Sequence, residues 1–331
     1  MPSEFSRVLN DTTILKQRMN KLIRIGTRKS KLALWQAEHI AELLEEGGLK
    51  TEIVKIETTG DKILDVSIAK IGSKGVFTEE IEEQLQNGTI DIAVHSAKDM
   101  QSELPEGFEL IAFTERETPN DVIISHNKDL DLNNTAQPIK LGTSSNRRIA
   151  TLKRYFPHVE TAAVRGNLQR RIQKMEEGQC DALLLAYAGV HRMEYDNMIV
   201  DKLPLNVFTP AVGQGSVAVE VHKNLPEEKR EIVRRLTNHK PTEHCLLAER
   251  SFLKTLQGGC SVPVFALADN DSENIHISGG IISLDGSEEI RIQKSAPLHE
   301  AEKAGRELAL EILERGGDRI LSEIKKELGK K

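Results

Sequence analysis

Short apolar runs that end in small polar residues alternate with helical segments along the first two thirds of the chain. This alternation constrains the fold more than any other feature of the sequence. Strands that alternate with helices are typical of parallel α/β sheets. The ranges that we expect to form strands are Leu22–Ile25, Thr51–Glu57, Ile90–His95, Lys140–Gly142, Thr161–Val164 and Ala182–Ala186.

Helical spacing and capping residues follow most of these strands. A helix is expected from Ser30 to Gly47-Gly48, and Thr78 is expected to cap a helix that runs through Gln86. Thr143-Ser144-Ser145 are candidate caps for a helix whose Ile149, Leu152 and Phe156 share one face. Leu168, Ile172 and Met175 recur at the i, i+4, i+7 spacing of a further helix.

The pattern changes from about residue 241 onward. A helix that contains Leu246 and Phe252 is followed by alternating strands at Val262–Ala268 and Ile275–Ser283, and then by one final helix from about Pro297. This segment predicts a smaller α+β domain.

Composition excludes several classes of function. The net charge is −6, from 45 basic and 51 acidic residues, which argues against a surface built for nucleic acid. The longest strongly apolar, uncharged run, Ala182–Val190, is well short of the ~20 residues that a membrane span needs. Three cysteines without a Cys-x-x-Cys pair indicate a reduced, cytoplasmic chain. Residues 1–20 lack the apolar stretch of a secretory signal, and we expect a flexible extension there.

Basic residues are concentrated between Lys140 and Arg171: this segment contains eight of them and only one acidic residue, Glu160. A solvated basic face is the ordinary interpretation of such a cluster. However, several arginines lie within about a turn of expected strand-to-helix junctions, which line the ligand crevice of open α/β sheets and favour anions. These arginines are Arg28, Arg147, Arg148, Arg165 and Arg192. The common nucleotide-binding glycine motifs are missing, so a ligand with several carboxylates is favoured over a phosphate.

Two further residues are candidates for chemistry. Asp99 follows Lys98 just past an expected buried strand. Either the two residues form an exposed ion pair, or the Asp99 carboxylate stabilises a cationic intermediate. Cys260 lies between Gly258-Gly259 and Ser261-Val262-Pro263; it is either a small buried turn residue or a reachable nucleophile or attachment point. We interpret His95 as a hydrogen-bonded core histidine, find no obvious partner for His191, and see no spacing typical of a metal site.

Several motifs resemble the porphobilinogen deaminase (hydroxymethylbilane synthase) family. The resemblance runs from about Ile23 to the last helix, roughly nine-tenths of the chain. The motifs that carry it are Gly26-Thr27-Arg28-Lys29-Ser30, Thr59-Gly60-Asp61, Ala93–Asp99, Gly142–Arg148, Arg165-Gly166-Asn167, Ala211–Gly215, and Glu249-Arg250 with Gly258–Pro263.

The resemblance implies a fold and a division into domains. Two periplasmic-binding-protein-like α/β lobes would enclose a cleft, and a smaller α+β C-terminal domain would carry the attachment cysteine. The implied boundaries are 21–116 with 216–238 for the first lobe, 117–215 for the second lobe and 239–331 for the third domain.

The resemblance also implies an activity. Members of the family are transferases of tetrapyrrole (haem) biosynthesis that join four porphobilinogen molecules head to tail with loss of ammonia. The chain grows on a covalently bound dipyrromethane made from the substrate, and hydrolysis releases linear hydroxymethylbilane. A cytoplasmic monomer is expected, with porphobilinogen as its small-molecule partner and with no nucleic acid or membrane partner.

Matched residue by residue, the family assigns roles to positions of this chain. Asp99 would be the catalytic carboxylate, Cys260 would hold the cofactor by a thioether, and no metal is implied. The implied cofactor-binding residues are Ser96, Lys98, Thr143, Ser144, Ser145, Arg147, Arg148 and Arg171. The implied substrate-binding residues are Arg28, Ser30, Gln36, Arg165, Arg192 and Gln214.

This sequence departs from the family pattern at a few positions, among them Gln169-Arg170, which differs from the commoner small-polar pair before Arg171. Gln101 stands where the family often has proline, and we expect it to loosen the loop after Asp99. Asn146 replaces a usual leucine and is expected to alter local packing.

Two other classes of function are compatible with parts of the sequence. A two-lobed, non-enzymatic binding protein for a polycarboxylate would explain the arginines but not Cys260. A transferase or redox enzyme that uses the Cys260 thiolate would explain the cysteine, and its Cys260 would be free rather than blocked.

Overall fold

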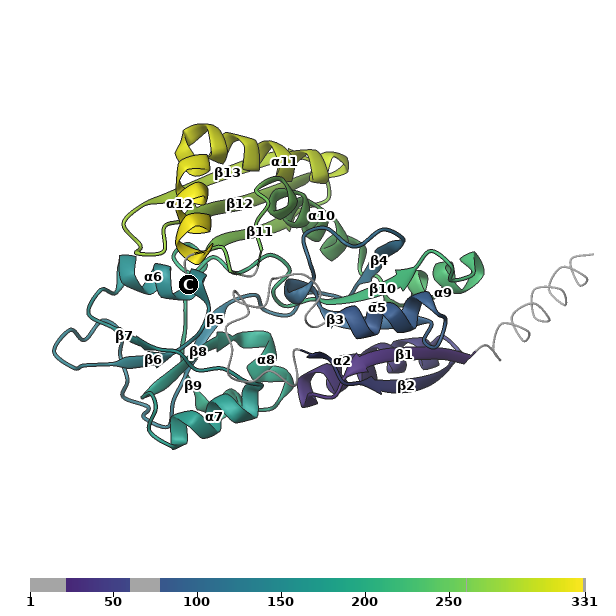
Figure 1. The fold of residues 1–331 in the computed structure, drawn as a ribbon, viewed down its shortest axis with the longest axis horizontal. Coiled ribbons are helices and arrows are strands. Elements are labelled where there is room, and N and C mark those ends of the chain that lie inside the picture. The colour runs from purple at the N-terminus through teal and green to yellow at the C-terminus, as the bar shows by residue number, and fades with distance from the viewer. Residues whose placement is uncertain (1–21, 60–77, 260, 330–331) are drawn as a thin grey trace, which may run out of the picture.

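Three β-sheets organise the chain (Figure 1). The structure is a computed structural model that describes residues 22–59, 78–259 and 261–329. The expected extension at residues 1–20 and the cysteine at position 260 lie outside these described residues.

The first sheet has the strand order β2-β1-β3-β10-β4. Strands β2, β1 and β3 are parallel, whereas β10 runs antiparallel to both β3 and β4. The bounds are β1 (Leu22–Arg28), β2 (Lys50–Ile56), β3 (Ile92–Ser96), β4 (Phe108–Phe113) and β10 (Val217–His222).

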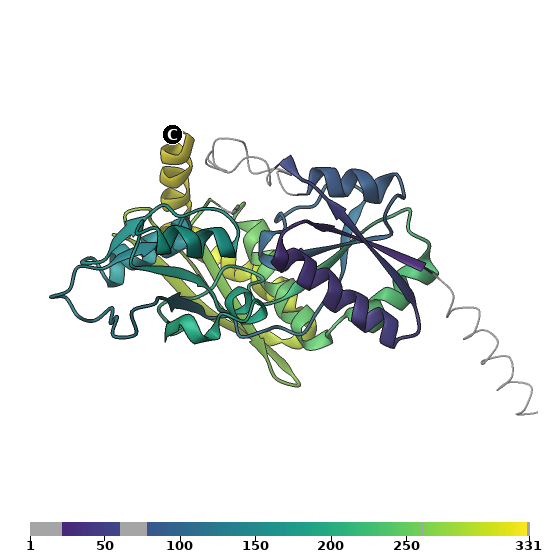
Figure 2. The same ribbon diagram turned by 90° about the horizontal axis from the view of Figure 1, so that it is seen from below.

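Helices cover both faces of this sheet, as Figure 2 shows for α2 (purple) and α5 (blue). Ile40 and Leu44 of α2 and Val233 of α9 pack on one face, and Ile81 and Leu85 of α5 pack on the other. The bounds are α2 (Lys31–Glu46), α5 (Glu79–Gln86) and α9 (Glu227–Thr237). We call the first sheet and its helices the first lobe.

The second sheet repeats the arrangement with the order β7-β6-β8-β5-β9. Again three strands are parallel, and the fourth, β5, runs antiparallel to its neighbours β8 and β9. The bounds are β5 (Asp121–Ile124), β6 (Lys140–Gly142), β7 (Glu160–Ala162), β8 (Ala182–Ala186) and β9 (Ile199–Lys202).

Helix α6 packs on one face of the second sheet through Leu152, and α7 and α8 pack on the other through Ile172 and Val190. Their bounds are α6 (Asn146–Tyr155), α7 (Leu168–Glu176) and α8 (Tyr187–Arg192). We call the second sheet and its helices the second lobe. The chain passes between the lobes twice, from β4 to β5 and from β9 back to β10.

The third sheet is antiparallel, in the order β11-β12-β13, and it lies beside the final helices at the top of Figure 1. Phe252, Ile281, Leu308 and Ile320 belong to the apolar core of this third domain. The bounds are α10 (Lys240–Thr255), β11 (Val264–Asn270), β12 (Asn274–Ile282), β13 (Glu289–Pro297), α11 (Ala301–Ile312) and α12 (Asp318–Gly329).

The expected fold class is confirmed: two α/β lobes are followed by a smaller α+β domain. Strands β4, β5, β9 and β10 were not predicted, and three further details of the sequence analysis are wrong. The lobes are mixed sheets rather than parallel ones, the third domain has an additional strand, β13, and the single final helix is two helices, α11 and α12. Gly316, with φ of 102°, separates those two helices.

Candidate active site

The turn that follows β3 carries the first group of predicted site residues. Strand β3 ends at Ser96, and the short helix η1 (Ala97–Asp99) presents Lys98 and Asp99. The backbone N–H of Ala97 donates to the carbonyl of Ser216, 3.0 Å away, so the segment that returns from the second lobe holds this turn. Asp99 is exposed, which places its carboxylate at the surface of the turn rather than in a buried position.

Gly213 allows the returning segment to approach the turn. Its φ of 76° lies in the left-handed region that favours glycine. A Cβ atom at this position would lie 2.9 Å from the carbonyl carbon of Ala97 and 3.0 Å from the nitrogen of Lys98. The glycine-rich motif around Gly213 therefore serves close contact with the Lys98–Asp99 turn.

Predicted residues of the first lobe lie at the same edge of its sheet. Parallel β1 and β3 are neighbours, so Arg28 at the end of β1 lies at the edge where Ser96 ends β3. Ser30 caps α2 by accepting from the backbone N–H of Ala33. The buried Gln36 donates from Nε2 to Ser96 Oγ over 2.9 Å.

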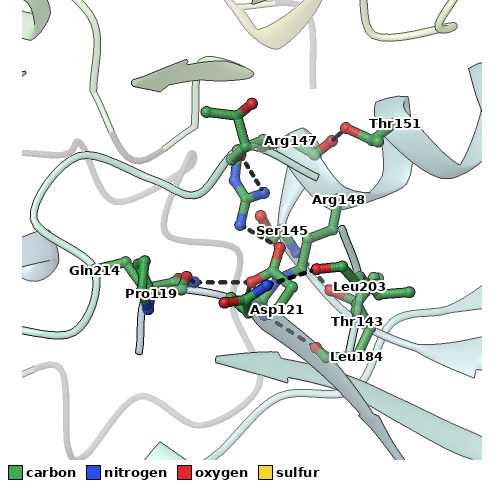
Figure 3. Close-up of polar contacts among 12 residues, drawn as sticks. Pro119, Asp121, Thr143, Ser145, Arg147, Arg148, Thr151, Leu184, Leu203 and Gln214 are labelled. Atoms are coloured by element: carbon green, nitrogen blue, oxygen red, sulfur yellow. Dashed lines mark hydrogen bonds and ion pairs between the residues drawn. The ribbon is translucent and has the colours of Figure 1, made fainter. Parts of the chain in front are cut away.

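Asp121, at the start of β5, organises the second group (Figure 3). Its carboxylate lies 2.8 Å from Nη2 of Arg147 and 2.7 Å from Nη2 of Arg148, and all three side chains are buried. Nε2 of Gln214 donates to the same carboxylate over 3.0 Å. Burial alone would raise the pKa of Asp121, but the two guanidinium groups hold it well below its usual range.

Arg147 and Arg148 therefore point into the protein, where each makes a further hydrogen bond. Arg147 donates to the carbonyl of Thr209, and Arg148 donates to the carbonyl of Leu184. The buried Nε atoms of both arginines have no hydrogen-bond partner among the described residues. Two arginines with one carboxylate leave a net positive charge in this part of the second lobe.

The three hydroxyl residues before α6 bond differently from the expected caps. Ser145 is at the N-cap position, but its side chain makes no capping hydrogen bond. Thr143 Oγ1 accepts from the backbone N–H of Ser145, and Ser144 Oγ donates to the carbonyl of Val164. Thr78 likewise precedes α5 without a side-chain cap. These positions were predicted correctly, whereas the capping bonds were not.

Electrostatics link the two groups across the lobes. The pKa of Lys98 is lowered to about 8, mainly by burial, with Arg148 and Arg171 acting in the same direction and Asp99 and Asp121 opposing them. The pKa of Arg171 falls to about 10 through burial and the charge of Arg148, while Asp99 opposes this and Arg165 adds to it. Lys98 of the first lobe is thus coupled electrostatically to Arg148 and Arg171 of the second, and Arg171 is coupled in turn to Asp99 and Arg165.

Arg192 and Arg171 are anchored by backbone carbonyl groups. Nη2 of Arg192 donates to the carbonyl of Gly215 over 2.7 Å, and Nε of Arg171 donates to that of Gly166 over 2.7 Å. Burial lowers the pKa of Arg192 against the charge of Glu117. Gln214 is buried and also donates to the carbonyl of Pro119, so it ties the returning segment to the start of β5.

Two of the departures from the family pattern, Gln101 and Asn146, make specific contacts. Gln101 is tied rather than loose: its Nε2 donates to Thr78 Oγ1, and its carbonyl accepts from Nη2 of Arg250. Asn146 donates from Nδ2 to the carbonyl of Ser261 over 2.7 Å, which joins α6 to the third domain.

The structure also shows the surroundings of the histidines and cysteines that the sequence analysis discussed. His95 pairs with the buried Glu220 over 3.1 Å, as expected of a core histidine. His191 does have a partner, Asp196, at 2.9 Å, which corrects our interpretation. Cys180 and Cys245 are buried, and burial raises the pKa of both thiols, that of Cys245 to about 11.

Sequence reasoning missed two residues of this region, Asp121 and Trp35, whose ring centre lies 5.0 Å from the guanidinium carbon of Arg192. An aspartate that opens the apolar run Val122-Ile123-Ile124 was a usable signal, because a buried carboxylate requires a cationic partner. Within the described ranges we find no group of acidic, histidine or cysteine residues that could hold a metal ion. No helix there is long and apolar enough to cross a membrane.

Comparison with known protein families gives two matches. The porphobilinogen deaminase, dipyromethane cofactor binding domain matches residues 23–230, and the porphobilinogen deaminase, C-terminal domain matches residues 243–314.

Individual relatives extend over nearly the whole chain. A porphobilinogen deaminase of Cytophaga hutchinsonii is 55% identical over 94% of this chain and 100% of its own length. One of Desulfosudis oleivorans is 53% identical over 92% of this chain and 98% of its own. The resemblance stated from the motifs is confirmed, and these matches favour neither the binding protein nor the cysteine-dependent alternative.

Solved structures give weaker similarities. The VFT2 domain of Bordetella pertussis BvgS (TM-score 0.41, 14% identity) aligns with 69% of this chain and 90% of its own. The probable amino-acid ABC transporter extracellular-binding protein ytmK of Bacillus subtilis (TM-score 0.40, 13% identity) aligns with 65% and 90%.

Proposed function

This chain belongs to the porphobilinogen deaminase family, and from that premise we propose a role for each residue of the site. The enzyme is a hydroxymethylbilane synthase, a transferase of tetrapyrrole biosynthesis. It joins four porphobilinogen molecules head to tail with loss of ammonia and releases linear hydroxymethylbilane by hydrolysis. Its cofactor is dipyrromethane.

The observation that carries the proposal is a set of electrostatically coupled cations around the Lys98–Asp99 turn. Lys98, Arg148, Arg165 and Arg171 all act electrostatically on the Lys98–Asp99 turn or on one another. Each porphobilinogen unit bears two carboxylates, so a growing chain of pyrroles needs several cationic partners. Arginine forks grip carboxylates with paired hydrogen bonds.

The residues present fit the dipyrromethane cofactor. Lys98 and Arg171 have pKa values lowered mainly by burial, and Arg147 and Arg148 have buried Nε atoms without partners among the described residues. Such a site is short of anions and suits a group with several carboxylates. When bound, the cofactor supplies the pyrrole carbon to which the first substrate is joined. We assign its binding to Ser96, Lys98, Thr143, Ser144, Ser145, Arg147, Arg148 and Arg171, and its thioether to Cys260.

Asp99 is assigned the catalytic role. Loss of ammonia from porphobilinogen leaves positive charge on the pyrrole nitrogen. A carboxylate held on the short η1 turn stabilises that charge and accepts a hydrogen bond from the pyrrole N–H group. The same group can move a proton during coupling. The exposure of Asp99 leaves its oxygens open to a substrate.

The remaining predicted residues are assigned to the substrate carboxylates and to positioning. Arg28, Arg165 and Arg192 would bind acetate and propionate groups, with Ser30 beside Arg28. Gln36 would act through Ser96, and Gln214 through Asp121, because those are the groups that they contact.

We extend the proposal to organisation and location. The division into 21–116 with 216–238, 117–215 and 239–331 is supported by the three sheets. A monomer is proposed because one chain supplies every assigned group. The net charge of −6 and three cysteines support a cytoplasmic enzyme without a nucleic acid partner, and no membrane partner is proposed.

Intact mass spectrometry tests this function. The purified parent should carry a covalent dipyrromethane, and Cys260→Ala should fold but lack both the adduct and turnover. Cys245→Ala, which removes a buried thiol elsewhere, should keep the adduct. An adduct of unchanged mass on Cys260→Ala would refute the attachment site, and a parent without an adduct would favour a polycarboxylate-binding protein.

A further inference from the structure

Trp35 touches Arg192 across the boundary between the two lobes. The guanidinium carbon of Arg192 lies 5.0 Å from the centre of the Trp35 ring, within the range of a cation–π interaction. Trp35 belongs to α2 of the first lobe, and Arg192 ends α8 of the second. The two helices contact one another (Figure 1).

The ring itself is held in place. His39, one turn further along α2, stacks on Trp35 with ring centres 5.3 Å apart and planes 17° apart. Burial lowers the pKa of His39, and the charge of Arg192 lowers it further, against Glu42 and Glu46. Burial and the charge of Arg192 thus both favour the neutral imidazole of His39, which stacks on the ring beside the Arg192 cation.

A third segment, which contains Gly215, also contacts Arg192. Its Nη2 donates to the carbonyl of Gly215, which also accepts from the backbone N–H of Glu117. Gly215 has φ of 98°, and a Cβ atom there would lie 2.3 Å from the carbonyl oxygen of Glu117. The β4–β5 and β9–β10 segments, which connect the lobes, thus meet at the Gly215 carbonyl oxygen, to which Arg192 donates.

We propose that Trp35 is a positioning residue for Arg192, and this inference rests on the proposed role of Arg192 in binding a substrate carboxylate. A guanidinium has five N–H donors, and the bond to Gly215 takes one. The Trp35 ring restricts the guanidinium plane and offsets part of its desolvation without using a donor. Because ring and guanidinium come from different lobes, the orientation of Arg192 depends on how the lobes sit together.

Steady-state kinetics of the holoenzyme test the proposal in a double-mutant cycle. Trp35→Leu should raise KM for porphobilinogen about threefold to tenfold and leave kcat nearly unchanged, the range that a cation–π contact accounts for. Trp35→Phe keeps an aromatic face and should give a smaller rise. In an Arg192→Gln background, Trp35→Leu should raise KM no further. Leu32→Ala is the matched control on the same helix: Cδ2 of Leu32 would lie 3.7 Å from a Cβ atom on Gly189 of α8, and because Leu32 offers no aromatic face to a guanidinium, its truncation should leave KM unchanged.

Fluorescence gives a readout that needs no change at the ring, because Trp35 is the single tryptophan of the chain. Arg192→Gln removes the cation from the ring and should shift the tryptophan emission. A full additional effect of Trp35→Leu in the Arg192→Gln background, or an emission spectrum that Arg192→Gln leaves unchanged, would overturn the positioning role. An Arg192→Gln enzyme with parental KM would instead refute the proposed role of Arg192 itself.

Discussion

Substitutions of Asp99 can separate the effect of charge from the effect of side-chain shape on the reaction. Asp99→Asn keeps the size of the side chain but removes the negative charge that stabilises the pyrrole cation. The loss of one preorganised electrostatic group costs about 100- to 1,000-fold in rate. Single-turnover release of ammonia should therefore slow at least about a hundredfold. The melting temperature should not change, because the residue is exposed.

Asp99→Glu provides the control for that prediction. It keeps the charge and displaces it by one methylene group, so its rate should fall between those of the parent and Asp99→Asn. An Asn variant within a few-fold of the parent rate would return Asp99 to the role of a surface residue.

The lowered pKa of Lys98 predicts a specific pH dependence of the free energy of unfolding. Its pKa is lowered to about 8 in the folded protein, whereas a lysine in an unfolded chain has a pKa of about 10.4. Between these values the unfolded state binds more protons, so this group makes the unfolding free energy rise with pH in that window. In the cofactor-free Cys260→Ala background, urea unfolding at pH 7.5 and 9.5 should show this increment, and Lys98→Met should remove it. Equal pH dependence in both proteins would contradict the lowered pKa.

At the scale of elements, Gly213 tests the contact between the returning segment and η1. Gly213 and Gly88 have nearly the same φ, 76° and 75°, but a Cβ on Gly88 would meet nothing within 4 Å. Gly88→Ala should cost only the backbone strain of about 1–2 kcal/mol and leave turnover unchanged. Gly213→Ala should destabilise the protein further and, by displacing Lys98 and Asp99, slow turnover about 10- to 100-fold. Equal activities of the two variants would show that the close approach is not needed.

The elements that the sequence predicted are those whose signals are local. Strand β8 and helix α7 were located closely because their apolar periodicity is complete within one short segment. Strands β5 and β10 were missed because each pairs antiparallel with strands distant in sequence, and β10 carries Glu220 and His222 among its apolar residues. Strand β13 was missed because much of it is polar and partly exposed.

In the site, too, features with local sequence signals could be predicted, and those that depend on distant residues could not. The strand-end positions of Lys98, Asp99 and the arginines follow from the α/β pattern, but the partners of Arg147 and Arg148 do not. On α6 both arginines are buried, which a periodicity that counts only apolar residues cannot show. Their burial depends on Asp121, which is supplied by a strand that the periodicity did not reveal.

At the scale of the whole molecule, Glu249 joins the third domain to both segments that cross between the lobes. This buried carboxylate of α10 lies 2.8 Å from Nη1 of Arg116 and accepts from the backbone N–H of Gly213 over 2.8 Å. It also accepts from the N–H of Ala268 in β11. Burial alone would lower the pKa of Arg116, but the Glu249 charge raises it, as expected of a buried ion pair.

Glu249→Gln should therefore destabilise the whole protein rather than one lobe. Removal of one partner leaves the Arg116 charge buried and uncompensated, at a cost of about 3–5 kcal/mol in unfolding free energy. Lys254→Ala on the same helix is the matched control, because the Lys254–Glu103 pair is exposed, by 60% and 72%, and is worth about 0–1 kcal/mol. Urea unfolding followed by circular dichroism measures both. Because Glu249 also holds the Gly213 segment, the Gln variant should lose activity at temperatures where the Lys254→Ala variant keeps it. If Glu249→Gln is as stable as Lys254→Ala, the ion pair does not hold the three parts together.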